Sequence, residues 1–196
     1  MAIRTRETSD AEIARLVAEA VGGNSTAFAA LVRATQRYAY ALAFRFLADA
    51  EDAKDAVQEA FVRVWKHLPE FDPSRTFTTW LYTIVTNLCM DRLRSKRRWN
   101  LLFGSTEGRG EPVDPTDLEA VHSDAELGMM IRRLTSSLSP TQREVFVLRD
   151  LQDCPVDEVV RITGLSEGSV RTNLHLARKA IRAMMKTRYG VEEQAK

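Results

Sequence analysis

The stretch from Thr76 to Arg98, TFTTWLYTIVTNLCMDRLRSKRR, combines residue types that bind nucleic acids. Trp80 and Tyr82 offer aromatic faces on which single-stranded bases can stack. A basic tract follows, which consists of Arg92, Arg94, Lys96, Arg97 and Arg98. These cations repel one another unless an anion such as phosphate lies near. We predict that this stretch holds and opens a DNA duplex. Alternatively, the cations only suit the end of a solvated helix, and the aromatics belong to the core.

A helix must position these groups, because apolar residues recur at helical spacing after Thr76. The buried stripe is predicted to consist of Phe77, Leu81, Ile84, Val85 and Leu88. Beside it lies a neutral face, predicted from Thr79, Thr83, Thr86, Asn87 and Met90. We expect this second face to remain outside the core.

Three further helices are predicted ahead of this one. They run from Asp10 to Val21, from a cap at Asn24 or Ser25, and from a cap at Asp49. Together with the aromatic and basic helix they form a first all-helical domain, residues 10–99. The outer face of the third helix is acidic in its first half, which suits either a solvated helix start or a binding surface. The pattern alone leaves both possibilities open.

Residues 100–124 lack apolar periodicity and are rich in glycine, proline and acids. We predict a flexible acidic linker here. Its charge either serves solubility or imitates nucleic acid inside a basic channel.

A second domain, residues 125–188, is predicted to contain a helix-turn-helix. Ser139 and Gln142 form a predicted capping box, and the turn falls at Gly164, Leu165 and Ser166. The last helix is predicted to present an outward arc of mostly polar side chains with cations on its flanks. Such a surface suits the major groove of DNA, where polar groups can read base edges and cations can contact phosphates. The arc consists of Ser169, Thr172, His175, Leu176 and Lys179, and the flanks of Arg171, Arg178 and Arg182. A plain pair of helices is the alternative.

Composition excludes several classes of protein. The formal net charge of +1 conceals a segregation, since residues 107–126 hold seven acids and one base whereas residues 166–188 hold one acid and six bases. No apolar run approaches the about 18 residues of a membrane span, so we predict a cytoplasmic protein without membrane insertion. The histidines are scattered, Cys89 and Cys154 lack metal-ligand spacing, and no phosphate loop appears. We therefore expect no catalytic residue, metal or cofactor, and no enzyme.

Several segments in one order resemble the extracytoplasmic-function (ECF) sigma factors of bacterial RNA polymerase. They are DAEDAKDAVQEAFVRVW, TFTTWLYTIVTNLCMDRLRSKRR, LSPTQREVFVLRDL and LHLARKAI, and the resemblance spans roughly residues 10–185. It implies an all-α protein of two small helical domains, one like sigma region two and one like region four. The first would bind core polymerase and melt the minus-10 element, and the second would read the minus-35 element. The implied partners are polymerase core, promoter DNA and an anti-sigma factor, which the family usually has.

The resemblance also assigns residues to each role. Core-polymerase binding would fall to Asp52, Asp55, Gln58, Glu59 and Arg63. The minus-10 surface would comprise the loop from Phe71 and the residues Thr76, Trp80, Thr83, Asn87, Asp91, Arg92, Arg94, Lys96, Arg97 and Arg98. The minus-35 surface would comprise Ser169, Arg171, Thr172, His175, Arg178 and Lys179.

The chain departs from the family pattern where the family often has arginine. The departures are Thr83 and Thr86 on the DNA-facing helix, and Asn173 and Leu176 on the recognition helix. They affect the expected promoter sequence and the strength of backbone contact. A stand-alone helix-turn-helix repressor is the alternative function, although a repressor has no need of aromatic and basic groups in its first domain.

Overall fold

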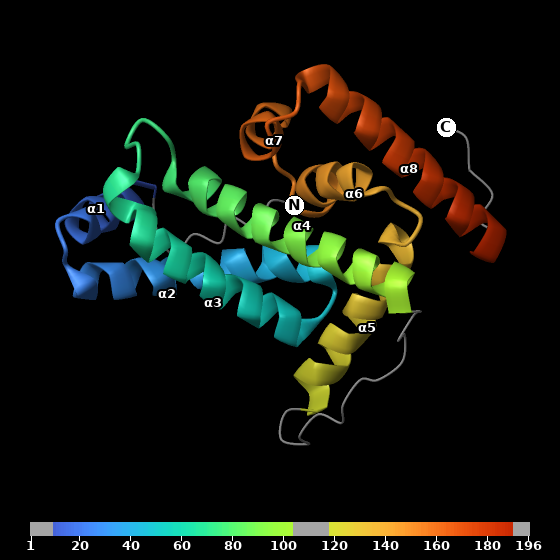
Figure 1. Cartoon of the computed structure of the whole chain (residues 1–196), viewed down its shortest axis with the longest axis horizontal. Helices are drawn as coiled ribbons and strands as arrows, with labels where there is room; N and C mark the ends of the chain where they lie inside the picture. Colours follow the sequence, from blue (N-terminus) through green and yellow to red (C-terminus); the bar gives the residue numbers. More distant parts are fainter. Residues whose placement is uncertain (1–9, 104–117, 190–196) are drawn as a thin grey trace.

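The computed structural model describes residues 10–103 and 118–189, and within these ranges it is built of helices without a strand (Figure 1). The first unit contains α1 (Asp10–Val21), α2 (Ser25–Leu47), α3 (Ala50–His67), the 3-10 turn η1 (Leu68–Glu70) and α4 (Phe77–Phe103). The second unit contains α5 (Leu118–Thr135), α6 (Pro140–Phe146), the π-helical turn η3 (Val147–Leu151), α7 (Val156–Thr163) and α8 (Glu167–Tyr189). The all-α prediction is confirmed.

Polar caps start the helices where the sequence predicted. The Asn24 side chain accepts hydrogen bonds from the Thr26 and Ala27 amides at 3.0 and 3.1 Å, and the Asp49 side chain accepts one from the Asp52 amide at 3.0 Å. These bonds satisfy amides that have no partner inside the helix. At α6, Ser139 and Gln142 form the predicted capping box.

The first unit has its core where α2, α3 and α4 pack together. The predicted stripe of α4 lies in that core, with Leu81 and Val85 fully buried and Ile84 partly buried. On α3 the apolar side is equally buried, including Ala53, Ala60 and Val64. Helical periodicity therefore oriented these two helices correctly.

Helix extends into both ends of the segment predicted as a linker. α4 continues to Phe103 and α5 begins at Leu118, while residues 104–117 of the predicted linker lie outside the described ranges. Leu101 and Leu102 favour a helix, and no glycine or proline occurs before Gly104, which explains the extension of α4.

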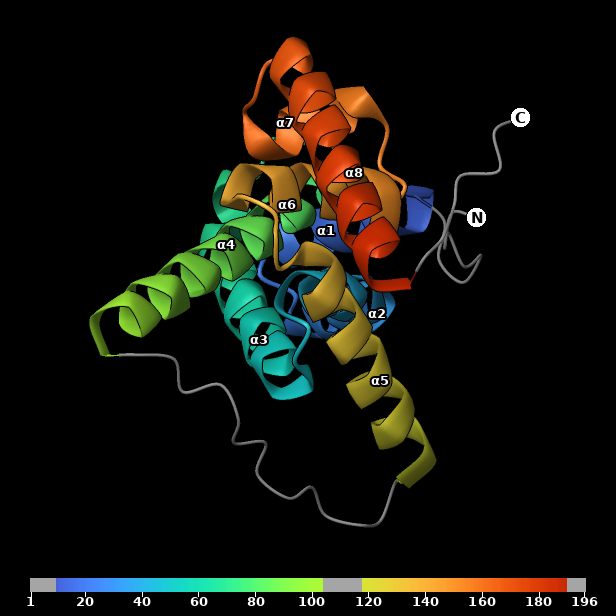
Figure 2. The same ribbon diagram turned by 90° about the vertical axis from the view of Figure 1, so that its right-hand side faces the viewer.

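The second unit packs directly on the first. α6 and α7 contact α4, and α5 contacts α2 and α3 (Figures 1 and 2). α7 and α8 form the helix-turn-helix, with Gly164 at φ 71° in the turn, a conformation that favours glycine. α8 lies on the outside of this unit, at the top of Figure 2.

Candidate nucleic-acid interface

Part of α4 lines a small open pocket. The pocket has a volume of about 220 Å³ and is lined by Arg63, His67, Trp80, Ile84 and Asn87. The first two side chains come from α3 and the other three from α4. Asn87 is exposed and carries amide donors and acceptors, whereas Trp80 supplies a ring face. This combination can hold a planar base by stacking and by hydrogen bonds.

Aromatic packing fixes the Trp80 ring. Its centroid lies 5.0 Å from that of Phe71 and 5.9 Å from that of Phe77. The preceding loop turns at Asp72, whose carboxylate accepts a hydrogen bond from the Ser74 amide at 2.9 Å. Hydrogen bonds from Ser74 hold the pKa of Asp72 below its ordinary value. The predicted loop therefore leads into α4 in an ordered conformation, with Thr76 exposed at its end.

The neighbouring arc of α4 is covered, which differs from the expected open face. Thr86 and Met90 are 0% and 1% exposed, and Thr79 donates a hydrogen bond to Glu158 of α7 at 3.0 Å. The cover is the second unit, through α6 and α7. Periodicity within α4 could not reveal this, because the covering residues lie about 60 to 80 positions further along the chain.

Tyr82 belongs to the covered side as well. It is 7% exposed, its hydroxyl accepts a hydrogen bond from Gln152 at 2.8 Å, and burial raises the pKa of Tyr82 to about 12. Of the two aromatics that could stack on bases, only Trp80 lines an open pocket in this arrangement.

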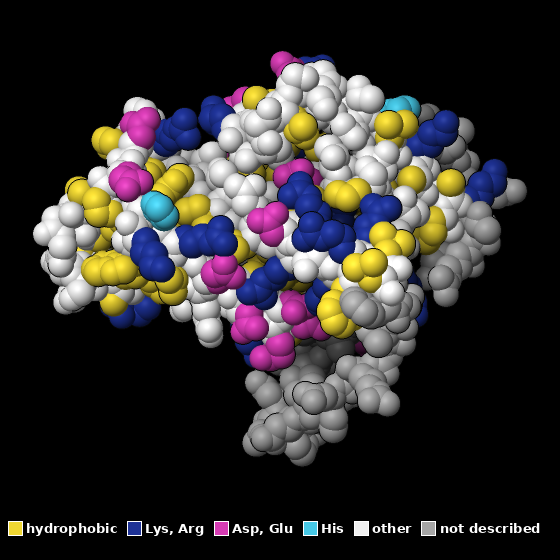
Figure 3. Space-filling view, viewed as in Figure 1, with side chains coloured by type: hydrophobic (Ala, Val, Ile, Leu, Met, Phe, Trp, Pro, Cys, Tyr) yellow, Lys and Arg dark blue, Asp and Glu magenta, His cyan; other side chains and the backbone are white. Residues whose placement is uncertain are grey.

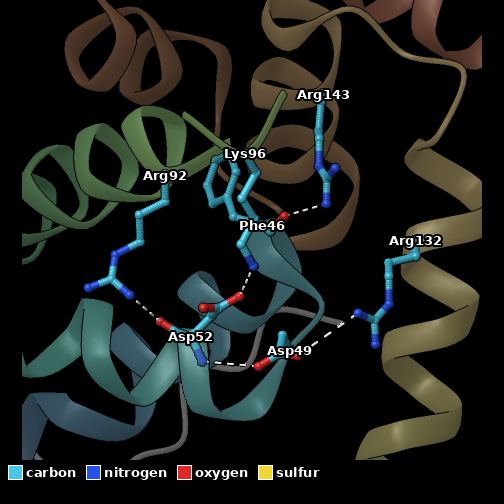
Figure 4. A network of polar contacts seen from close by, with 7 residues as sticks. All are labelled: Phe46, Asp49, Asp52, Arg92, Lys96, Arg132 and Arg143. Carbon is cyan, nitrogen blue, oxygen red and sulfur yellow. Dashed lines mark hydrogen bonds and ion pairs between the residues drawn. The ribbon is translucent and has the colours of Figure 1, made fainter. Parts of the chain in front are cut away.

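Cations gather on the C-terminal half of α4, where Figure 3 shows Lys and Arg side chains in the middle of the face beside acidic groups. Arg92 donates to the Asp52 carbonyl at 3.1 Å and to the Glu59 carboxylate at 3.3 Å, and Lys96 pairs with Asp52 (Figure 4). Arg94 pairs locally with Asp91 at 3.1 Å. The basic end of α4 is thus tied to α3 through two of its cations.

The acidic face of α3 is accordingly divided. Asp55 and Gln58 are exposed, whereas Asp52 and Glu59 are partly buried and face cations of α4. Burial alone would raise the pKa of Glu59, but hydrogen bonds from Arg63 and Arg92 outweigh it and lower the pKa. The structure therefore joins the predicted polymerase-binding and minus-10 residues in one network.

α8 presents its outward arc as predicted. Val170 and Ala177 are fully buried, and Leu176 is 41% exposed. The other members of the arc are half-buried at Ser169 and exposed at Thr172, His175 and Lys179. The predicted rotation of this helix is confirmed.

Acids hold two of the three flanking arginines of α8. Arg178 donates to both carboxylate oxygens of Asp150, at 2.8 and 2.6 Å, and this bonding raises the pKa of Arg178. Arg171 pairs with Glu167 one turn earlier. A phosphate would have to compete with these carboxylates for the guanidinium groups.

Comparison with known proteins identifies the two units. The chain matches the family models for Sigma-70 region 2 over residues 31–99 and for Sigma-70, region 4 over residues 128–181. It is 34% identical over 174 residues to the ECF RNA polymerase sigma factor SigW of Bacillus subtilis, which covers 84% of this chain and 91% of SigW. The chain belongs to the ECF RNA polymerase sigma factors. It is a sigma-type transcription initiation factor, and the stand-alone repressor is not favoured, because region 2 accounts for the first unit.

Further relatives agree with this assignment. SigL of Mycobacterium tuberculosis is 34% identical over 169 residues, covering 83% of this chain and 93% of SigL. The solved structure of CnrH in complex with the cytosolic domain of CnrY has a TM-score of 0.65 at 27% identity, covering 89% of this sigma factor and 97% of that chain. RpoE in complex with the anti-sigma factor NepR from Bartonella quintana shares the fold, with a TM-score of 0.62 at 19% identity and coverage of 82% and 98%.

The described residues also bear on two other kinds of site, a membrane span and a metal site. Over residues 10–103 and 118–189, no helix is both long and apolar enough to cross a membrane. Across the same ranges, His, Cys, Asp and Glu side chains form no group of three or more that could hold a metal ion.

Sequence reasoning missed the residues that join the two units. They include Gly128 of α5, Arg143 of α6, Gln152 after η3 and Glu158 of α7. Only Gly128 carried a signal, since a glycine inside an amphipathic helix costs stability and therefore indicates a close approach. The three polar residues look like ordinary surface positions in the sequence.

Proposed function

We propose that this sigma factor uses the pocket of Trp80 and Asn87 to hold a base extruded from the minus-10 element. The observation that carries the proposal is the pocket's position: its α4 residues lie between the ordered loop that precedes the helix and the basic tract that begins at Arg92. Holding an unpaired base shifts the equilibrium from closed duplex toward open strands. In this proposal α4 contributes more to strand opening than to affinity for the closed duplex.

The proposed minus-10 surface consists of Thr76, Trp80, Thr83, Asn87, Asp91, Arg92, Arg94, Lys96, Arg97 and Arg98. Within it, phosphate contact falls mainly to Arg94, Arg97 and Arg98, which are exposed. Arg92 and Lys96 are bonded to α3 and brace α4 in place. Thr83 is half-buried beside the covered arc.

The proposed core-polymerase surface is the outer face of α3, with Asp52, Asp55, Gln58, Glu59 and Arg63. Asp55 and Gln58 are its exposed members. They can meet a basic partner without breaking an internal pair, whereas Glu59 already bonds Arg63 and Arg92. Promoter DNA, a cytoplasmic location and an anti-sigma factor complete the proposed setting.

The proposed minus-35 surface is the outward arc of α8. Ser169, Thr172 and His175 reach base edges, while Arg171, Arg178 and Lys179 contact phosphates. Exposure of the arc supports this assignment. Because Asp150 holds Arg178 and Glu167 holds Arg171, binding requires exchange of carboxylate for phosphate.

Replacing Asn87 by alanine tests the proposal. On a promoter bound by the polymerase holoenzyme, Asn87→Ala should lower permanganate reactivity of thymines near the start site and leave most closed-complex binding intact. Gln36→Ala is a matched control, because Gln36 of α2 is an exposed polar side chain that belongs to none of the proposed binding surfaces. Normal permanganate reactivity of Asn87→Ala in a preformed closed complex would show that the pocket holds no base.

A further inference from the structure

The pocket beside Trp80 is built between one row of side chains on α3 and one on α4. Arg63 and His67 stand four residues apart on α3. On α4, Trp80, Ile84 and Asn87 follow at intervals of four and three residues. Residues at these spacings share one face of a helix. Arg63 and His67 therefore face the same space as the Trp80 ring and the Asn87 amide.

Arg63 lies on the side of α3 that faces α4. Asp52 and Glu59, which pair with cations of α4, precede it by eleven and four positions, and these spacings keep all three on one side of the helix. Gln58, an exposed member of the proposed polymerase surface, lies about 140° around the helix from Arg63. The family resemblance groups Arg63 with polymerase binding, whereas its position on α3 favours a role in the pocket.

Glu59 holds the guanidinium of Arg63. The Arg63 Nη2 donates to one carboxylate oxygen of Glu59 at 2.7 Å, and Arg92 donates to the other at 3.3 Å. A guanidinium has several N–H donors and no acceptor, so a bond through Nη2 leaves other donors for a ligand. The Arg63 side chain is 46% exposed, which gives a ligand in the pocket access to these donors.

The groups that line the pocket differ in their power to distinguish bases. The Trp80 ring can stack on any base, and the Asn87 amide both donates and accepts. The His67 ring, whose Nδ1 lies 3.3 Å from a Glu70 carboxylate oxygen, can likewise do both. Of the described residues that line the pocket, Arg63 alone is restricted to donating. A base edge must therefore offer an acceptor to Arg63.

We infer that Arg63 makes the pocket selective for an extruded base with a carbonyl oxygen, and thus selective against adenine. The inference rests on the proposed function, because selection matters only if the pocket holds a base. Guanine, cytosine and thymine carry a carbonyl oxygen that accepts from the guanidinium. Adenine has an amine in place of the carbonyl oxygen, and an amine facing a guanidinium leaves two donors without an acceptor. Arg63 is then a specificity-determining residue that Glu59 positions.

Binding of the polymerase holoenzyme to non-template minus-10 strands tests the inference. The strands come from a promoter that the holoenzyme opens, and fluorescence anisotropy at saturating core polymerase measures their affinities. Replacing each nucleotide in turn by an abasic one locates the extruded base in the wild type, and the four bases are then compared at that position. We expect the wild type to bind the adenine strand about tenfold more weakly than the other three.

Arg63→Ala should abolish this difference between the bases. Because it is a ratio of affinities, the difference is insensitive to effects of the substitution on core binding or on phosphate contact. Glu59 keeps its bond from Arg92, so the fold should persist. Arg63→Gln should favour adenine instead, since an amide can both donate to adenine and accept from it. Lys66→Ala is the matched control and should keep the wild-type difference, because Lys66 is an exposed cation of α3 that does not line the pocket.

Equal affinity of the wild type for all four bases, or an unchanged difference in Arg63→Ala, would overturn the inference. If no abasic position weakens binding by the wild type, the pocket holds no base, and the proposed function fails together with the inference. One sensitive position combined with an unchanged difference in Arg63→Ala keeps the proposed function and rejects the role of Arg63.

Discussion

Replacing Arg92 by alanine separates a bracing role from a direct DNA contact. The guanidinium donates from α4 to the Asp52 carbonyl and to the Glu59 carboxylate, and the side chain is 27% exposed. A residue so placed holds α4 against α3. We therefore expect Arg92→Ala to destabilise the fold, as well as to affect promoter opening.

The size of the effect follows from these two bonds. The hydrogen bond from a charged group to the carbonyl contributes about 1.5 kcal/mol, at the low end for such bonds. The solvent-accessible pair with Glu59 contributes about 0.5 kcal/mol. The sum of about 2 kcal/mol corresponds to a fall in melting temperature of about 4–8 °C for a chain of this size.

Thermal unfolding followed by circular dichroism measures this fall. Arg94→Ala is the matched control, because Arg94 is 55% exposed and its ion pair is a local one with Asp91, three residues away. It should change the free energy of unfolding by less than about 0.5 kcal/mol. An unchanged melting temperature for Arg92→Ala, with promoter opening lost, would refute the bracing role and place the guanidinium on DNA.

Three other substitutions test separate surfaces. Leu176→Arg should add about one phosphate contact and steepen the slope of log affinity against log salt for minus-35 DNA by about 0.9. Because Leu176 is exposed, the melting temperature should stay unchanged, and a large fall in it would contradict this prediction. Burial raises the pKa of Glu144, so the wild type gains stability as pH falls through that folded-state pKa. Glu144→Gln should then melt higher than the wild type near pH 7, with the advantage shrinking toward about pH 4.3, and an advantage independent of pH would be evidence against it. Asp55→Lys should weaken binding to core polymerase without altering the melting curve, and unchanged co-purification with core would exclude Asp55 from that surface.

Local sequence rules predicted most of the helices and their orientation. Capping side chains placed the starts of α2, α3 and α6 correctly, because each satisfies amides within its own first turn. Periodicity oriented α3, α8 and the apolar stripe of α4 for the same reason. The exposed arc of α8 and the position of Trp80 were therefore accessible from the sequence.

Contacts between distant segments were not accessible in this way. The pairing of Lys96 with Asp52 joins positions 44 residues apart, and the cover over Thr86 depends on docking of the second unit. Polar side chains such as Gln152 have no periodic signature that separates a bridging role from a solvated one. A helix face that looks free in the sequence can therefore be covered in the folded chain.

Transcription by core polymerase with and without this chain tests the central claim most directly. Purified bacterial core enzyme and genomic DNA from the source organism would be combined, and the 5′ ends of the transcripts sequenced. We predict start sites that depend on the chain and that share two upstream elements at a constant spacing, as two DNA-binding units require. Transcripts with the same start sites in the presence and absence of the chain would contradict the account.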